Sequence, residues 1–127
     1  MNADGPLRIL VVEDHHDSRV MLERLLRSSG HEALLAGSVA TALAVARSTT
    51  FDMVISDIDL PDGDGCALMQ TLREMTGAAG IAVSGHVGEE HQRRAKAAGV
   101  CVHLCKPITF GKLLDAIEEC RSEHTPA

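Results

Sequence analysis

The stretch MVISD, residues 53–57, is a short apolar run that ends on an aspartate. Three further runs end on polar residues in the same way: ILVVED at residues 9–14, IAVS at 81–84 and VHLCKP at 102–107. Continuous apolar runs of this length are typical of parallel strands covered on both faces. Open α/β sheets place their sites at the carboxyl ends of such strands. We therefore expect the polar residues that end the four runs to share one edge of a sheet.

Helical patterns alternate with the apolar runs along the whole chain. We predict strands at residues 7–13, 31–36, 51–57, 80–84 and 100–105, and helices at about 16–29, 38–48, 66–75, 87–98 and 109–119. Met21 and Met75 are expected on buried helix faces, as is Phe110, which opens an i, i+3, i+4, i+7 pattern in the last helix. Ser38 and Gly30 are expected to cap and to end helices. Five β/α units predict an α/β fold with a parallel sheet, right-handed crossovers and helices on both faces.

The composition fits one globular domain and excludes several classes of function. The chain has 127 residues, which suits one domain at residues 7–120 with tails at 1–6 and 121–127. A formal net charge of −6 argues against direct binding of nucleic acid or of an anionic membrane. The sequence has neither a run long enough to insert into a membrane nor a signal-peptide pattern. We expect a cytoplasmic protein.

The residues at the strand ends predict phosphoryl chemistry. Asp57 ends the most apolar strand and is the candidate nucleophile, because a carboxylate can accept a phosphoryl group as an acyl phosphate. Lys106 would supply positive charge to the phosphoryl oxygens, and the hydroxyl of Ser84 would donate a hydrogen bond to one of them. Glu13 and Asp14 would add two carboxylates to the same edge.

Clustered carboxylates need a cation, and oxygen ligands suit Mg²⁺ or Mn²⁺. We predict Asp14 and Asp57 as direct ligands and the backbone carbonyl of Asp59 as a third. Glu13 is expected to reach the ion through water.

Three other clusters have simpler interpretations than a metal site. Cys101, His103 and Cys105 alternate on one strand face, but ligands on adjacent same-face positions rarely converge on one tetrahedral ion. The pair His15-His16 is interpreted as an exposed loop. The acidic loop at residues 59–65 lacks the downstream glutamate of an EF-hand and is interpreted as a turn.

These motifs together resemble the response-regulator receiver domain of two-component signalling. The resemblance covers about residues 7–120 and rests on Glu13-Asp14, on residues 57–61 followed by Gly65, on Ser84-Gly85 and on Lys106-Pro107. It implies the flavodoxin-like (βα)5 three-layer sandwich with strand order 2-1-3-4-5, and Mg²⁺ as cofactor. It also implies that Asp57 receives its phosphoryl group from the phosphohistidine of a histidine kinase or of a phosphotransfer domain.

The resemblance assigns further roles by position. Ser84 matches the hydroxyl that moves on phosphorylation, and His103 stands where the family usually has a switching Tyr or Phe. His103 is expected either to swing in a similar way or to have no switching role. Asp59 and His86 match the positions that tune phosphoryl lifetime in the family. The resemblance does not say whether either residue lengthens or shortens that lifetime.

Several interpretations of function remain open at this stage. Asp57-Ile58-Asp59 also has the spacing of a haloacid-dehalogenase-type phosphatase, although its mid-chain place and the short chain argue against it. An inactive pseudo-receiver is a second alternative.

Within the receiver class, we expect a domain excised from a hybrid histidine kinase or multidomain regulator, or else a stand-alone regulator. The stretch at residues 103–108 resembles the receivers of hybrid kinases, and such a kinase could tether the domain at a membrane. Output would pass to a downstream protein partner, through the first helix or through the fourth helix, fifth strand and fifth helix. We expect a phosphoacceptor rather than a turnover enzyme.

Overall fold

A computed structural model of the chain describes residues 5–85 and 88–124. Its main sheet has five parallel strands: β1 (Arg8–Val12), β2 (Glu32–Ala36), β3 (Met53–Asp57), β6 (Ala79–Ser84) and β7 (Val102–Cys105). The strand order is β2-β1-β3-β6-β7, which is 2-1-3-4-5 when the strands of this sheet alone are counted. This confirms the predicted flavodoxin-like architecture.

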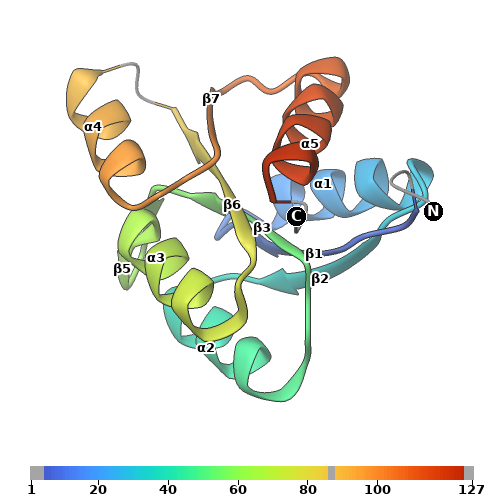
Figure 1. Cartoon of the computed structure of the whole chain (residues 1–127), viewed down its shortest axis with the longest axis horizontal. Helices are drawn as coiled ribbons and strands as arrows, with labels where there is room; N and C mark the ends of the chain where they lie inside the picture. The colour runs from blue at the N-terminus through green and yellow to red at the C-terminus, as the bar shows by residue number, and fades with distance from the viewer. Residues whose placement is uncertain (1–4, 86–87, 125–127) are drawn as a thin grey trace.

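Helices cover both faces of the sheet (Figure 1). They are α1 (His16–Ser28), α2 (Val39–Ser48), α3 (Gly65–Thr76), α4 (Glu89–Ala97) and α5 (Phe110–His124). Alternate strand residues point to opposite faces, so the sheet has two aliphatic cores. Ile9 and Ile55 pack with α1 and α5, whereas Leu10 and Val54 pack with α2, α3 and α4.

Three large apolar residues that were predicted on buried faces are exposed. Met21 is 63% exposed, Met75 48% and Phe110 43%. On α1 the buried residues are instead Leu22 and Leu26, one turn apart. Met75 lies in the last turn of α3, beyond its last buried residue Leu72, and Phe110 opens α5 before its first buried residue Leu113. Periodicity identifies an apolar face, but it does not say how far along the helix that face is covered.

The structure also corrects two predicted segments. The loop after β3 contains a small antiparallel hairpin of β4 (Asp59–Leu60) and β5 (Gly63–Asp64) rather than irregular turns alone. The last helix, predicted to end near residue 119, continues to His124, so residues 121–124 are helical and not a tail. Among the described residues, no helix combines the length and apolar character that a membrane crossing needs.

Three local features set the ends of the helices. Ser38 caps α2 as predicted, because its hydroxyl accepts a hydrogen bond from the Thr41 N–H at 3.1 Å. Gly30 follows α1 with a φ of 92°, a conformation that favours glycine. Gly65 starts α3 against the end of β3, where a Cβ would lie only 1.8 Å from the carbonyl oxygen of Asp57. Only glycine allows the two backbones to approach so closely at the predicted site.

Candidate functional site

The predicted site residues converge at the carboxyl edge of the sheet. Asp57 is the last residue of β3, Glu13 follows β1 directly and Lys106 follows β7. The Lys106 ammonium lies 3.1 Å from Glu13 Oε1 and 3.1 Å from Asp57 Oδ1. The two carboxylates are almost fully buried, whereas Asp14 beside them is more exposed. The structure thus brings the acids and the lysine together at this edge.

The three charged groups perturb one another. Burial raises the pKa of Asp57 to about 7; a hydrogen bond and charge from Glu13 add to this, and Lys106 opposes it. Burial also works against ionisation of Glu13, but hydrogen bonds from Asp57, the His15 N–H and Lys106 outweigh it and lower the pKa of Glu13. Of the two carboxyls, Asp57 is therefore the one that takes up a proton as the pH falls through about 7, while Glu13 stays ionised. Burial favours the neutral form of Lys106, but hydrogen bonds to both acids outweigh this effect and raise its pKa.

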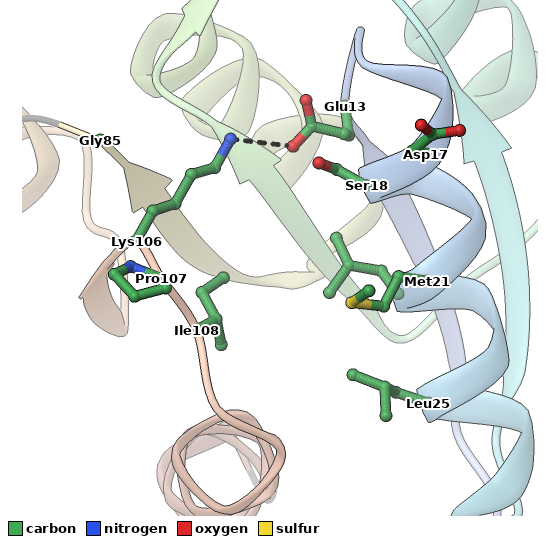
Figure 2. Close-up of a pocket in the computed structure, with 10 residues that line it drawn as sticks. Glu13, Asp17, Ser18, Met21, Leu25, Gly85, Lys106, Pro107 and Ile108 are labelled. Carbon is green, nitrogen blue, oxygen red and sulfur yellow. Dashed lines mark hydrogen bonds and ion pairs between the residues drawn. The ribbon is translucent and has the colours of Figure 1, made fainter.

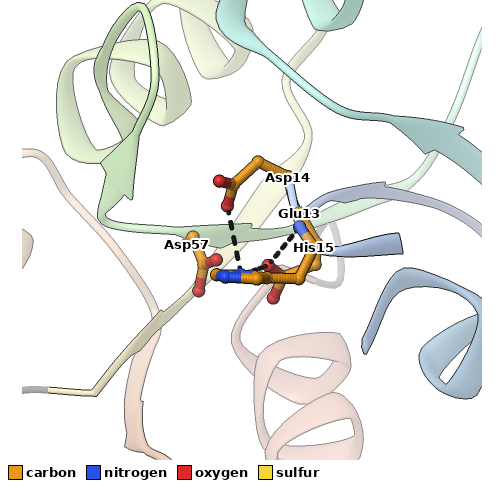
Figure 3. Close-up of side chains that lie close together, drawn as sticks. All are labelled: Glu13, Asp14, His15 and Asp57. Atoms are coloured by element: carbon orange, nitrogen blue, oxygen red, sulfur yellow. Dashed lines mark hydrogen bonds and ion pairs between the residues drawn. The ribbon is translucent and has the colours of Figure 1, made fainter. Parts of the chain in front are cut away.

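The loop between β1 and α1 presents further acidic and imidazole groups. His15 Nδ1 lies 3.2 Å from Glu13 Oε2 and 3.5 Å from Asp14 Oδ1 (Figure 3). Arg19 of α1 anchors this loop, because its Nη1 donates to the Glu13 carbonyl at 2.8 Å and to the Asp14 carbonyl at 3.4 Å. Arg19 was not among the residues predicted from the sequence. Its cation lies near the N-terminus of a helix, which the helix dipole disfavours, and this was the available signal.

Ser84 and His103 lie on adjacent strands beside the acidic cluster. Ser84 ends β6 and is 2% exposed. His103 Nε2 on β7 lies 3.3 Å from Ser84 Oγ, so the predicted pair is in contact. Burial, together with the charge of His91, lowers the pKa of His103. The ring is therefore neutral near pH 7 and can accept a hydrogen bond from the serine hydroxyl.

Comparison with known proteins agrees with this geometry. The profile of the response regulator receiver domain matches residues 9–118 of the chain. The chain belongs to the response regulator receiver domain family. Acceptance of a phosphoryl group in two-component signalling is the function of this family.

The relatives and structural neighbours of this receiver domain are of several kinds. A response regulator receiver protein of Anaeromyxobacter sp. strain Fw109-5 is 34% identical over 109 residues, which cover 85% of this chain and 46% of the relative. The sensor histidine kinase RcsC of Salmonella typhi is 30% identical over 119 residues, covering 93% of this chain and 12% of the kinase. A crystal structure of a CheY-like response regulator receiver domain protein from Methanospirillum hungatei JF-1 superposes with a TM-score of 0.88 at 27% identity, covering 94% and 97% of the two chains. The chain thus spans less than half the length of both curated relatives.

The donor set of the receiver domain fits the divalent ion that its family binds. Ligand atoms of Glu13, Asp14, His15 and Asp57 all lie within 4.8 Å of one another. Three of the four side chains offer carboxylate oxygens, which suit Mg²⁺ and Mn²⁺. The family's acidic pocket is therefore present.

The aspartates of the loop after Asp57 take part in structural contacts. Asp62 accepts the backbone N–H groups of Val39 at 2.8 Å and Ala40 at 3.1 Å, and these bonds at the start of α2 lower its pKa. Asp64 caps α3 and lies 2.8 Å from Arg94 Nη2 of α4. The side chain of Asp59 lies 3.4 Å from His91 Nε2, also on α4. The acidic side chains of this loop thus contact the start of α2 and the side of α4, and one of them caps α3. Such structural contacts are compatible with the interpretation of the loop as a turn and not as a calcium loop.

Two remaining sequence predictions concern other positions. His86 lies outside the described residues. His103 is directed to Ser84, Cys101 packs on the core beside α5, and none of the four cysteines forms a disulfide. Among residues 5–85 and 88–124, the group of metal-ligating side chains is the acidic cluster at β1 and β3.

A largely apolar groove opens beside Lys106 (Figure 2). One wall is α1, with Met21 and Leu25 facing the groove, and the other is the segment after β7, with Pro107 and Ile108. The Lys106–Pro107 bond is cis. The exposed Met21 is thus a wall of this groove and not a core residue.

Proposed function

We propose that this receiver domain takes a phosphoryl group from the phosphohistidine of a histidine kinase or histidine phosphotransfer domain onto Asp57. The observation that carries the proposal is the buried Asp57 carboxylate at the end of β3, 3.1 Å from the Lys106 ammonium. A phosphoryl group is anionic, so a carboxylate can meet it only where cations offset the charge. The domain acts as a phosphoacceptor that assists its own phosphorylation and dephosphorylation, not as a turnover enzyme.

In the transfer, the N–P bond of the donor breaks and an O–P bond forms to a carboxylate oxygen of Asp57. Lys106 pairs with a phosphoryl oxygen once Asp57 has lost its charge to the acyl phosphate. Ser84, at the end of the neighbouring strand, donates its hydroxyl to another phosphoryl oxygen. Each group lies at the carboxyl edge, so none needs a rearrangement of the sheet.

Asp14 and Asp57 would hold the divalent ion directly, with the backbone carbonyl of Asp59 as a third ligand and Glu13 acting through water. When bound, Mg²⁺ or Mn²⁺ neutralises the carboxylates and the incoming phosphoryl oxygens. The contact of Lys106 with both Glu13 and Asp57 supports a site built to balance this negative charge.

His103 takes the place of the family's aromatic switch. The ring contacts Ser84, so a hydroxyl that turns toward a phosphoryl group leaves His103, and the ring follows into the vacated space. Asp59 and His86 are proposed to tune phosphoryl lifetime. The contact of Asp59 with His91 gives the tuning position a link to α4.

The partner that delivers the phosphoryl group docks in the groove between α1 and the segment after β7. This groove borders Lys106 and is lined by the exposed Met21 and the half-buried Leu25 and Ile108. An amphipathic helix that carries a phosphohistidine fits such a surface. Output then passes to a downstream protein through α4, β7 and α5, without direct binding of nucleic acid.

Met21→Asp tests this docking surface. A charge in the groove should reduce transfer from a phosphohistidine donor about tenfold, the effect of 1.4 kcal/mol, while transfer from acetyl phosphate is unchanged. Met75→Asp is the matched control, because it places the same charge at an exposed methionine of α3 on the other face of the sheet. Equal loss in both variants would contradict docking at α1.

Relatives of two kinds, a receiver protein and a sensor histidine kinase, support two contexts for the domain. We propose a receiver at residues 7–120 from a hybrid kinase or multidomain regulator. It would lie in the cytoplasm, where a membrane-bound hybrid kinase could tether it at the membrane. A stand-alone regulator is the alternative.

The proposed function is tested by intact mass after incubation with acetyl phosphate, with and without Mg²⁺. Wild type should gain one phosphoryl group only with Mg²⁺, and Asp57→Asn should gain none. A gain that survives Asp57→Asn would overturn the assignment of the phosphoacceptor. Turnover of small phosphomonoesters would indicate the phosphatase chemistry instead.

A further inference from the structure

We propose that His15 is a ligand of the metal site, and that the site therefore binds divalent transition-metal ions such as Mn²⁺ or Co²⁺ in preference to Mg²⁺. This inference rests on the proposed function, because it concerns the ion of the same site. It assigns a nitrogen donor to a site that was predicted from oxygen donors alone.

The position of the ring carries the inference. A ring nitrogen of His15 belongs to the same group of ligand atoms as the carboxylate oxygens of Glu13, Asp14 and Asp57, all within 4.8 Å of one another. Figure 3 shows the imidazole extending from the loop toward the carboxylates of Asp14 and Asp57. An ion held by the Asp14 and Asp57 carboxylates would therefore have this nitrogen within reach as a further ligand.

The loop holds His15 in this place from both sides. Its backbone N–H donates to Glu13 Oε2 at 3.1 Å, which fixes the residue against the buried acid. Arg19 binds the carbonyls of Glu13 and Asp14, so the chain just before His15 is anchored to α1. The His15 side chain is 73% exposed, and the ring can therefore adjust toward an ion without disturbing the core.

Ligand chemistry gives the metal preference. Mg²⁺ strongly favours oxygen ligands and keeps its waters, whereas imidazole suits first-row transition metals. In a purely oxygen site the two classes differ through size and geometry. An imidazole that replaces a water adds a donor that strengthens binding of Mn²⁺ or Co²⁺ and gains nothing for Mg²⁺. His15 would thus set selectivity without taking part in phosphoryl transfer.

His16, the first residue of α1, provides a matched control directly after this loop. It is the next residue, is also an exposed histidine, and lies 3.5 Å from Arg19 Nη2 instead of the carboxylates. His15→Ala and His16→Ala therefore remove the same group from neighbouring positions, one inside the ligand cluster and one outside it.

The test is pulsed electron paramagnetic resonance of bound Mn²⁺, with the metal alone as the probe. Wild type and His16→Ala should show nitrogen coupling from an imidazole, and His15→Ala should not. Calorimetry should show Co²⁺ affinity falling about tenfold or more in His15→Ala, the size of loss seen when groups around metal sites are removed, with less than about threefold change for Mg²⁺. No nitrogen coupling in wild type, or its loss in His16→Ala alone, would overturn the assignment.

Acetyl phosphate with Mg²⁺ separates this inference from the proposed function. Phosphorylation of Asp57 without nitrogen coupling to Mn²⁺ would remove His15 as a ligand and leave the receiver function intact. Nitrogen coupling without phosphorylation by any donor would keep the ligand assignment and overturn the proposed function.

Discussion

Asp57 and Glu13 are two buried carboxyls whose negative charges repel each other at the site. Both carboxyls are buried, and one ammonium, that of Lys106, neutralises only one negative charge. Retaining a proton on Asp57 lowers this cost, which is why its pKa rises to about 7 while that of Glu13 is lowered. Because a protonated carboxyl is a poor metal ligand, proton loss and metal binding are linked at this residue.

Mg²⁺ affinity should consequently depend on pH. Asp57 is protonated below its pKa of about 7, so affinity should fall below pH 7, by up to about tenfold per pH unit, and level off above it. Calorimetry between pH 6 and 8, in buffers of different ionisation enthalpy, should detect one proton released per ion at the lower end. Glu13→Gln removes the neighbouring charge and should move the fall to lower pH. A Mg²⁺ affinity that is constant over this pH range would contradict the raised pKa of Asp57.

At the scale of elements, the sequence predicted every strand of the main sheet and every helix, because each has its own apolar period and the βα alternation leaves few topologies. It predicted the members of the acidic cluster for the same reason, since parallel strands bring their ends together. It could not predict the exposure of Met21, which depends on the width of the gap between α1 and the segment after β7. The contacts by which Arg19 anchors the β1–α1 loop were not predicted either. Its side chain binds the backbone carbonyls of two residues before the helix, and the spacing of residues in the sequence does not indicate such contacts.

Strands β6 and β7 should carry the signal of phosphorylation through Ser84 and His103. If the hydroxyl turns to the phosphoryl group, the His103 ring loses a contact of 3.3 Å and its NMR signals should shift. Ring signals of His31, which lies before β2 at the far edge of the sheet, should stay unchanged and serve as the internal control. Ser84→Ala should abolish the His103 shift while Asp57 is still phosphorylated. Unchanged His103 signals on phosphorylation of wild type would remove its switching role.

At the scale of the whole molecule, segments from both ends of the chain meet around His31. Its Nδ1 accepts the backbone N–H of Leu7, just before β1, at 3.0 Å. Glu118 and Arg121 of α5 act on its charge, and Arg121 also donates to the Gly5 carbonyl. His31 is 9% exposed, so the first strand, the second strand and the last helix meet at one buried imidazole.

Global stability should therefore fall in mild acid through His31. Burial and the nearby Arg121 lower the pKa of His31 below the ordinary histidine value of about 6.5, against the effect of Glu118. Between the two pKa values, His31 binds a proton in the unfolded chain but not in the folded protein. The contribution of His31 to the free energy of unfolding is therefore fully present above pH 6.5, and it is lost as the pH falls toward the lowered pKa of the folded protein. One proton can change the free energy of unfolding by at most about 1.4 kcal/mol per pH unit. In urea unfolding at pH 7.5 and 5.5, His31→Gln, whose amide oxygen can still accept from Leu7 but does not titrate, should lose less stability than wild type over this interval. Equal losses would show that the fold tolerates a charged His31, and that the junction of the two ends is not the acid-sensitive point of the domain.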